Sequence, residues 1–130
     1  MHIGRREFLS ASLVVLAGCA SAGGSKSGMT DNVITRSELE SVGSVTTYDA
    51  VQRLRPYYLR DRGPVSLLNA TARTRPVVFV DMTEYGEVES LRTFPASRIE
   101  QVRFYPGQQA VTKFGSVYGA GVIQLTMRSQ

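Results

Sequence analysis

The chain has 130 residues with 15 basic and 11 acidic side chains, and its one histidine and one cysteine are His2 and Cys19. A domain beyond Cys19 therefore cannot use Ser-His-Asp or Cys-His catalysis, Cys/His zinc sites, iron–sulfur clusters, His-ligated haem or disulfide bonds. The net charge of +4 does not by itself require a nucleic-acid partner, while chemistry by carboxylates or lysine stays open.

Residues 1–18 predict a signal peptide. Arg5 and Arg6 supply a positive start, and the apolar run 8–17, about ten residues long, is too short to span a bilayer. The next feature is a run of four residues, Leu16, Ala17, Gly18 and Cys19. This run resembles the lipobox of bacterial lipoproteins, in which the cysteine is acylated, for example with palmitate, and the chain is cut just before it. We therefore expect a protein held to a membrane by lipid on Cys19.

Two export routes fit the same leader. Arg5 and Arg6 followed by Phe8 and Leu9 resemble a twin-arginine signal, which would imply export of a folded protein. The arginines equally suit a general secretory leader that needs only positive charge. Ala20 is not the aspartate that retains lipoproteins in the inner membrane, so we expect an outer-membrane location on the periplasmic face.

Beyond the cysteine, composition divides the chain into a linker and one domain. Residues 19–32 are mostly Gly, Ser and other small or polar residues, which predicts a lipidated flexible linker. Residues 33–130 suffice for one small domain with a single core. With Arg5, Arg6 and Glu7 removed, 13 basic and 10 acidic residues remain, which is a mild positive charge.

The pattern of apolar residues predicts the elements in chain order. A short strand is expected at 33–35, and a helix at 47–54 with Ala50, Val51 and Leu54 on one face and Pro56 ending it. The remaining elements are a small strand at 65–68, a buried strand at 77–80, a turn at 81–86, one helical turn within 89–95, a half-buried strand at 100–105, a helix at 108–114 and a final strand at 122–127. We expect an α+β domain with a mixed sheet and two or three short helices.

Four segments of the second half follow one another in a definite order: 75–81 (RPVVFVD), Gly86, 89–102 and 114–126. They resemble the plug domain of TonB-dependent outer-membrane receptors. In that family a strand ends in Asp-Gly, a short helix places a Pro-x-x-x-Ile-Glu segment, and a glycine loop leads into the last plug strand. The resemblance is best over 75–126, and the expected helix at 47–54 fits a plug helix in order. It implies a plug-like domain over 33–130.

The chain departs from the plug pattern at several points. Met82 stands where the family usually has the turn glycine, and only Ala120 separates Gly119 from Gly121 in a shortened glycine loop. The linker holds no convincing TonB box, and the sequence stops directly after the plug-like part, so we expect no barrel. The resemblance therefore implies fold more firmly than function. We expect Gly115, Gly119 and Gly121 to be structural.

Three sets of polar side chains are candidates for a site. The acidic set could bind a cation such as calcium or act as a carboxylate pair on glycosides, but it equally suits a solvated turn, and we expect no metal. The basic set could contact anionic lipid headgroups, lipopolysaccharide or an acidic partner, or be a solvated surface. The tyrosines could form a contact surface or lie at the core edge. The acidic set is Asp81, Glu84, Glu87 and Glu89; the basic set is Arg53, Arg55, Arg60, Arg62, Arg73 and Arg75; the tyrosines are Tyr57, Tyr58, Tyr85, Tyr105 and Tyr118.

Together these observations predict a membrane-anchored lipoprotein whose plug-like domain is a non-enzymatic interaction or accessory module of the cell envelope, linked to outer-membrane receptor and transport systems. The expected partners are the membrane, through lipid on Cys19, and an outer-membrane barrel or another envelope protein; no cofactor and no nucleic acid are expected. One alternative is a periplasmic lipoprotein that binds a small ligand such as a glycan or metal chelate. Another is an enzyme that uses Asp or Glu, which needs two buried, converging carboxylates.

Overall fold

The computed structural model describes residues 31–63 and 73–130. The predicted signal peptide, the lipobox, all of the linker before Asp31 and the strand expected at 65–68 lie outside the described residues. Within the described ranges, no helix has the length and apolar character needed to cross a bilayer.

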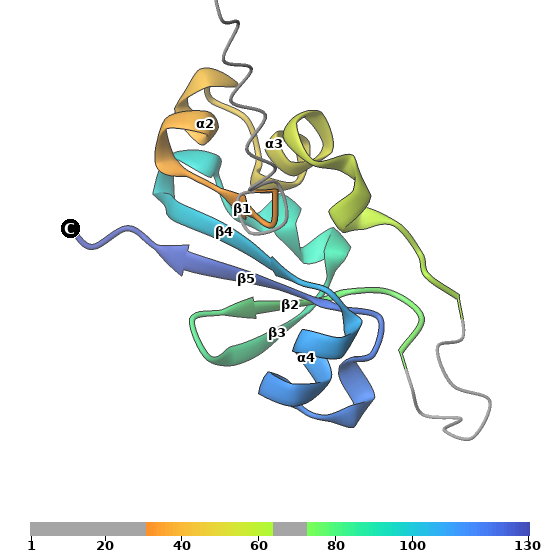
Figure 1. The fold of residues 1–130 in the computed structure, drawn as a ribbon. Coiled ribbons are helices and arrows are strands. Elements are labelled where there is room, and N and C mark those ends of the chain that lie inside the picture. The colour runs from red at the N-terminus through yellow and green to blue at the C-terminus, as the bar shows by residue number, and fades with distance from the viewer. Residues whose placement is uncertain (1–30, 64–72) are drawn as a thin grey trace, which may run out of the picture.

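The described part of the chain is an α+β domain with three short α-helices and several 3-10 turns around one sheet (Figure 1). In chain order the elements are β1 (Val33–Ile34), α2 (Arg36–Ser41), α3 (Thr47–Leu54), η1 (Pro56–Leu59), β2 (Val77–Val80), β3 (Thr83–Glu87), η2 (Val88–Thr93), η3 (Ala96–Arg98), β4 (Ile99–Tyr105), α4 (Gly107–Phe114), η4 (Ser116–Tyr118) and β5 (Val122–Met127). The expected fold class, with a mixed sheet and two or three short helices, is confirmed.

The strands lie in the order β1-β4-β5-β2-β3. β5, the last strand in the chain, occupies the centre, pairing antiparallel with β4 and parallel with β2. Two antiparallel partners then complete the sheet, β1 beside β4 and β3 beside β2. In Figure 1 the β1 side, with α2 and α3, is at the top, and β3 and α4 are at the bottom.

The sheet separates two apolar clusters of different size. The larger one lies under α2, α3 and η1 and includes Leu39, Val51, Val78 and Ile123. The smaller one lies under α4 and includes Phe79 of β2. Neighbouring residues of β2 thus reach opposite clusters, which confirms the prediction of a strand buried on both faces. Burying each such side chain stabilises the fold by about 1.5–3 kcal/mol.

The segment 81–86, expected as a turn, is a two-residue turn followed by strand β3. Thr83 and Glu84 pair with β2, and a bulge between Val78 and Phe79 leaves Tyr85 as the extra residue. The prediction was wrong because β3 is an edge strand with solvent on most of its side chains, so it carries no period-two apolar pattern. Asp81 has φ 56°, so an aspartate takes the left-handed conformation of this turn.

Helix α2 was not expected, because Leu39 is its one buried residue and six residues carry too little periodicity. A capping box supports it instead: the side chain of Glu38 accepts from the N–H of Thr35 at 2.8 Å. The helix α3, in contrast, has the predicted bounds 47–54 and ends where Arg55 precedes Pro56.

The glycine loop allows β5 to begin close to β4. Gly121 has φ +108°, and a Cβ at this position would lie 2.9 Å from the ring of Phe104. Gly115, at the end of α4, also has a positive φ, of 121°. Gly119 has an ordinary φ of −60°, and its carbonyl oxygen lies so close to Gly107 that a side chain there would clash.

Candidate interaction surfaces

The six candidate arginines separate into a paired and an unpaired group. Arg55 pairs with Glu38 at 2.9 Å, Arg73 with Glu84 at 2.7 Å, and Arg75 with Glu89 at 2.8 Å. The unpaired group is Arg53, Arg60 and Arg62, which have no described carboxylate within 4 Å and are exposed. Three arginines are thus occupied within the domain, and three present their charge to solvent.

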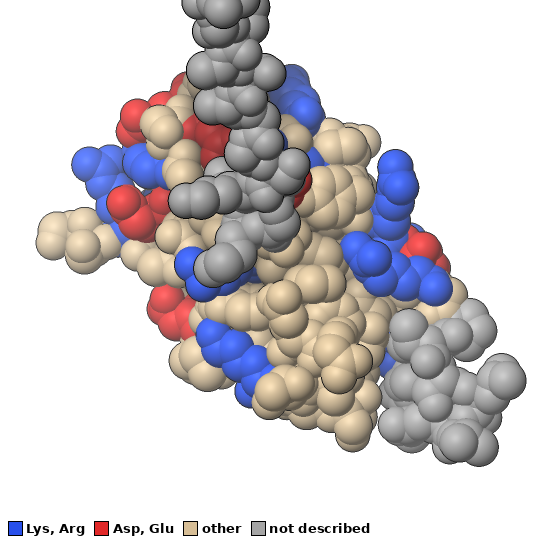
Figure 2. All heavy atoms as spheres, viewed as in Figure 1, with Lys and Arg blue, Asp and Glu red and all other residues tan. Residues whose placement is uncertain are grey.

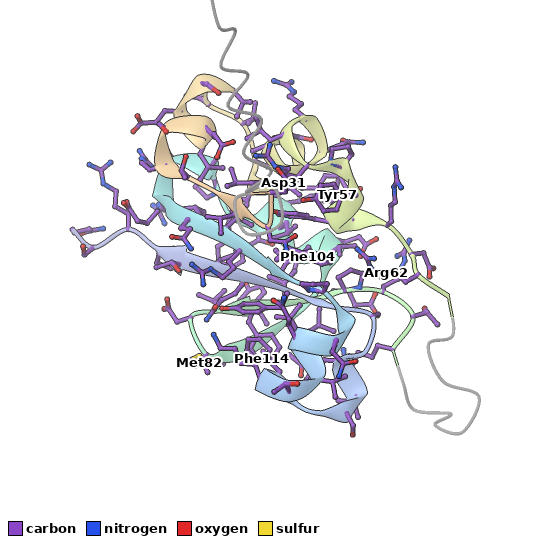
Figure 3. All side chains as sticks on the ribbon, in the orientation of Figure 1. Asp31, Tyr57, Arg62, Met82, Phe104 and Phe114 are labelled. Carbon is purple, nitrogen blue, oxygen red and sulfur yellow. The ribbon has the colours of Figure 1, made fainter. Side chains whose placement is uncertain are left out.

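The main-chain carbonyl oxygen of Asp31 accepts hydrogen bonds from three side chains that follow α3. The hydroxyls of Tyr57 and Tyr58 donate to it, the latter at 2.7 Å, and Nε of Arg55 donates at 3.3 Å. We call this arrangement of Arg55, Tyr57 and Tyr58 around residue 31 the Asp31 clamp. Asp31 and Tyr57 are labelled in Figure 3. It ties the start of the described domain, two residues before β1, to η1.

Tyr58 is the buried member of the Asp31 clamp. Its ring has no exposed surface and stacks on Phe104 with centroids 4.8 Å apart. Burial raises the pKa of the Tyr58 hydroxyl above its ordinary value of 10, because the phenolate would be desolvated. The hydroxyl therefore stays a hydrogen-bond donor to Asp31 across the physiological pH range.

One unpaired arginine contacts the clamp directly. The guanidinium of Arg62 lies 5.0 Å from the centroid of the Phe104 ring, and its Nη2 donates to the carbonyl oxygen of Tyr57 at 3.4 Å. A cation over an aromatic face is attracted by the ring quadrupole. Figure 3 shows Asp31, Tyr57, Phe104 and Arg62 on the same side of the domain. Arg62 therefore holds its charge beside residue 31.

The β3 edge carries the exposed large apolar side chains of the described chain. Met82 is 64% exposed and Tyr85 is 51% exposed. Tyr85 is positioned by its ring contact with Phe94, at 4.8 Å between centroids. Because β3 ends the sheet, its outer backbone groups face away from β2. An ordered strand edge beside exposed apolar side chains is a common starting point for strand-to-strand contacts between proteins.

Side chains of β5 and of η4 hold this edge in place. Gln124 of β5 donates through Nε2 to the carbonyl oxygen of Asp81 and approaches Sδ of Met82 at 3.6 Å. The hydroxyl of Tyr118 donates to Glu84, which raises the pKa of that hydroxyl, since losing its proton would place two negative charges together. The turn and the strand are therefore fixed to the body of the domain.

The four candidate carboxylates do not gather. Glu84 is bound by Arg73 and Tyr118, and Glu89 by Arg75. Among the described residues, no group of three or more His, Cys, Asp or Glu side chains has the geometry of a metal site. Of the tyrosines not yet placed, Tyr105 is buried, donating to Gln124 at 3.0 Å and accepting from Lys113 at 2.7 Å.

Three surface hollows adjoin at the end of the domain where α3 begins, and Ser97 lines all of them. The largest has a volume of about 500 Å³, and its lining includes Asp49, Arg92 and several hydroxyl groups. The guanidinium of Arg92 lies 3.7 Å from the centre of the Tyr48 ring. No sequence pattern indicated this region, because its residues come from five separate elements and the loops between them.

The sequence gave no match in a scan against protein-family models, and neither the curated proteins nor the solved structures showed significant similarity to it.

Proposed function

We propose that this protein is a lipid-anchored, non-enzymatic interaction module of the cell envelope, whose plug-like domain docks on an outer-membrane barrel or another envelope protein. Two sequence features support it: the lipobox-like run ending at Cys19, and the resemblance of 75–126 to receptor plugs. The structural observation that carries it is the β3 edge, with Met82 and Tyr85 exposed on it.

The β3 edge suits an extended segment of a partner protein. Such a segment can add to the sheet through main-chain hydrogen bonds, while pockets and side chains beside the edge select its sequence. Tyrosine and methionine are enriched at protein interfaces. Glu87 lies on the same strand without a described basic partner within 4 Å, so a partner segment with a basic residue would be favoured.

Site-specific crosslinking tests the docking proposal. A photoreactive amino acid replaces Tyr85 on the β3 edge in one variant of the full-length protein and Gln109, exposed on α4, in the matched control. We expect crosslinking in the native host to capture a specific envelope protein from position 85 and much less of it from position 109. Equal capture from the two positions, with only abundant envelope proteins recovered, would contradict the proposal.

Anchoring is tested separately by Cys19→Ala. Without its thiol the chain has no site for the acyl group, and lipid anchoring depends on about 0.8 kcal/mol for each buried methylene. We expect the variant to leave the membrane fraction and to lose incorporation of labelled palmitate. A variant that stays in the membrane after a high-salt wash would show that another feature anchors the chain.

A second candidate function is binding of a small polar ligand such as a glycan, and the hollows around Ser97 favour it. A volume of about 500 Å³ lies within the usual range for small-molecule sites, and the lining offers hydroxyl groups with one Arg and one Asp. Thermal-shift screening of glycans and metal chelates tests this candidate, with Arg92→Ala as the matched variant. A ligand that stabilises the protein but not the variant would support it, and no shift with any ligand would rule it out.

A further inference from the structure

We propose that the surface around the Asp31 clamp, with Arg53, Arg60 and Arg62, faces the membrane and contacts anionic phospholipid headgroups. This inference rests on the proposed lipid anchoring and deepens it, because it assigns the orientation of the anchored domain. The β3 edge then points away from the bilayer, toward the partner.

The position at which the chain reaches the domain favours this orientation. Cys19 and Asp31 are twelve residues apart, and a chain of that length spans at most about 43 Å. The three hydrogen bonds to the Asp31 carbonyl fix the point of entry beside β1. A lipid on Cys19 therefore limits the distance of the clamp from the membrane surface to about 43 Å, and this limit is tighter for the clamp than for any point across the sheet.

The positive charge beside that point also favours this orientation. Arg53 in the last turn of α3, Arg60 after η1, and Arg62 against Phe104 are exposed without a described carboxylate within 4 Å. Figure 2 shows basic side chains projecting at the right of the view, where Figure 1 places the segment that follows α3. Phosphate groups of anionic lipids supply the charge that these arginines lack within the domain.

The nearby acidic groups do not cancel this charge. Glu38 is bound by Arg55, and Asp61 lies 3.6 Å from Arg75 and accepts from the N–H of Gly63. The carboxylate of Asp31 opposes the arginines, so the surface keeps a modest positive charge. Three arginines near an anionic surface strengthen contact about 100-fold at low salt. Such contact is weak for a free protein but sufficient to orient one already held by lipid.

The distance between the β1 and β3 edges means that this orientation determines whether a partner can reach the β3 edge. Adjacent strands lie about 4.8 Å apart, so the four steps from β1 to β3 place the β3 edge about 19 Å from the β1 edge. If the β1 edge lies on the membrane, the β3 edge stands clear of the headgroups. An extended partner segment could then reach Tyr85 without displacing lipid.

The test uses the full-length lipidated protein in vesicles of phosphatidylcholine with and without 30% phosphatidylglycerol. A fluorophore is attached to Gln52→Cys, next to Arg53, or to Thr83→Cys on the β3 edge, both exposed positions, and lipids with a spin-labelled headgroup quench it. With phosphatidylglycerol we expect strong quenching at position 52 and little at position 83. In phosphatidylcholine alone, or at 0.5 M salt, the difference should shrink.

Charge reversal supplies the matched comparison. Arg53→Glu with Arg60→Glu should reduce the preference of position 52 for the membrane about 25-fold or more, with Arg53→Gln and Arg60→Gln giving an intermediate loss. The control, Arg98→Glu with Arg128→Glu, makes the same charge change at exposed positions at the other end of β4 and β5, and should have no effect.

Several outcomes would overturn the inference while leaving the proposed function intact. Equal quenching at positions 52 and 83 in anionic vesicles would show that the domain has no preferred orientation. Equal loss in the reversal and control variants would show a response to net charge only. The charge-reversal variant could also lose crosslinking to an envelope protein in cells while its quenching in vesicles stays unchanged. That result would show that the arginines contact an acidic protein partner and not lipid. Release of the wild-type protein from all vesicles would instead contradict the anchoring.

Discussion

At the β1 edge of the sheet, a strand of two residues lies between the Asp31 clamp and α2, whereas at the β3 edge a strand of five residues faces solvent with Met82 and Tyr85 exposed. Proteins usually shorten, cover or charge their edge strands because an open edge pairs with other chains. Here the β1 edge is the short one, with two residues against five in β3. The bulge and the two glutamates of β3 discourage pairing with arbitrary strands of other proteins. The exposed side chains beside this edge can still contact a specific partner.

The largest expected difference between the edges is in stability. Tyr58→Ala removes a fully buried ring from the β1 side and should lower the free energy of unfolding by about 3–5 kcal/mol. Tyr85→Ala, on the β3 edge, should cost less than about 1 kcal/mol, since half of the side chain is already in solvent. Urea unfolding of the two variants measures both values. Similar losses at the two positions would remove the contrast.

The ion pairs at the two edges sharpen the same comparison. Arg55→Ala breaks a pair with Glu38 and also two hydrogen bonds to carbonyl oxygens, so we expect a loss of about 1.5–3 kcal/mol. Arg73→Ala breaks the more exposed pair with Glu84 and should cost about 0–1 kcal/mol. Chemical denaturation at low ionic strength measures the stability of both variants. An equal loss of stability in the two would mean that the hydrogen bonds of Arg55 in the clamp add nothing to its ion pair.

Alkaline pH should weaken the β1 side through Tyr58. Its pKa is raised in the folded state, so folding holds on to a proton that the unfolded chain releases near pH 10. The contribution is complete below pH 10 and is lost as the pH rises above it. Tyr58→Phe, which costs about 1 kcal/mol at neutral pH by losing one hydrogen bond, should show a smaller further loss between pH 9 and 11 than the wild type. Parallel curves for the two proteins would contradict this assignment.

The smallest stability change, with a large functional one, is expected for Met82→Lys combined with Tyr85→Lys. Both side chains are exposed, so the free energy of unfolding should change by less than about 1 kcal/mol. Capture of an envelope partner, with the crosslinker placed at the neighbouring Thr83, should be lost, because lysine on an edge strand discourages pairing. Retained capture would place the docking surface elsewhere.

The elements predicted correctly from the sequence are those with strong local patterns. The strands at 77–80 and 122–127 and the helix at 47–54 have the expected bounds, because a β-branched run, strict alternation, and a proline after an apolar stripe act locally. Helix α2 and strand β3 were missed, because each has few buried side chains.

The surfaces were predictable only in part. The six arginines were singled out by composition. Which of them are neutralised depends on Glu38, Glu84 and Glu89, each of which is distant along the chain from the arginine that it pairs with. The Asp31 clamp joins residues more than twenty positions apart through a backbone oxygen, a group that no sequence pattern marks. Such contacts follow from the fold rather than from local preference.

The central place of β5 determines when the sheet can form during synthesis. Before Val122 leaves the ribosome, β4 can pair only with β1 and β2 only with β3, so the sheet can form only as two separate pairs of strands. The last strand joins them, and both apolar clusters are completed by its side chains. The five-stranded sheet therefore cannot be completed before β5 is available, and a ribosome-bound chain ending before residue 122 should be more sensitive to protease than the full chain.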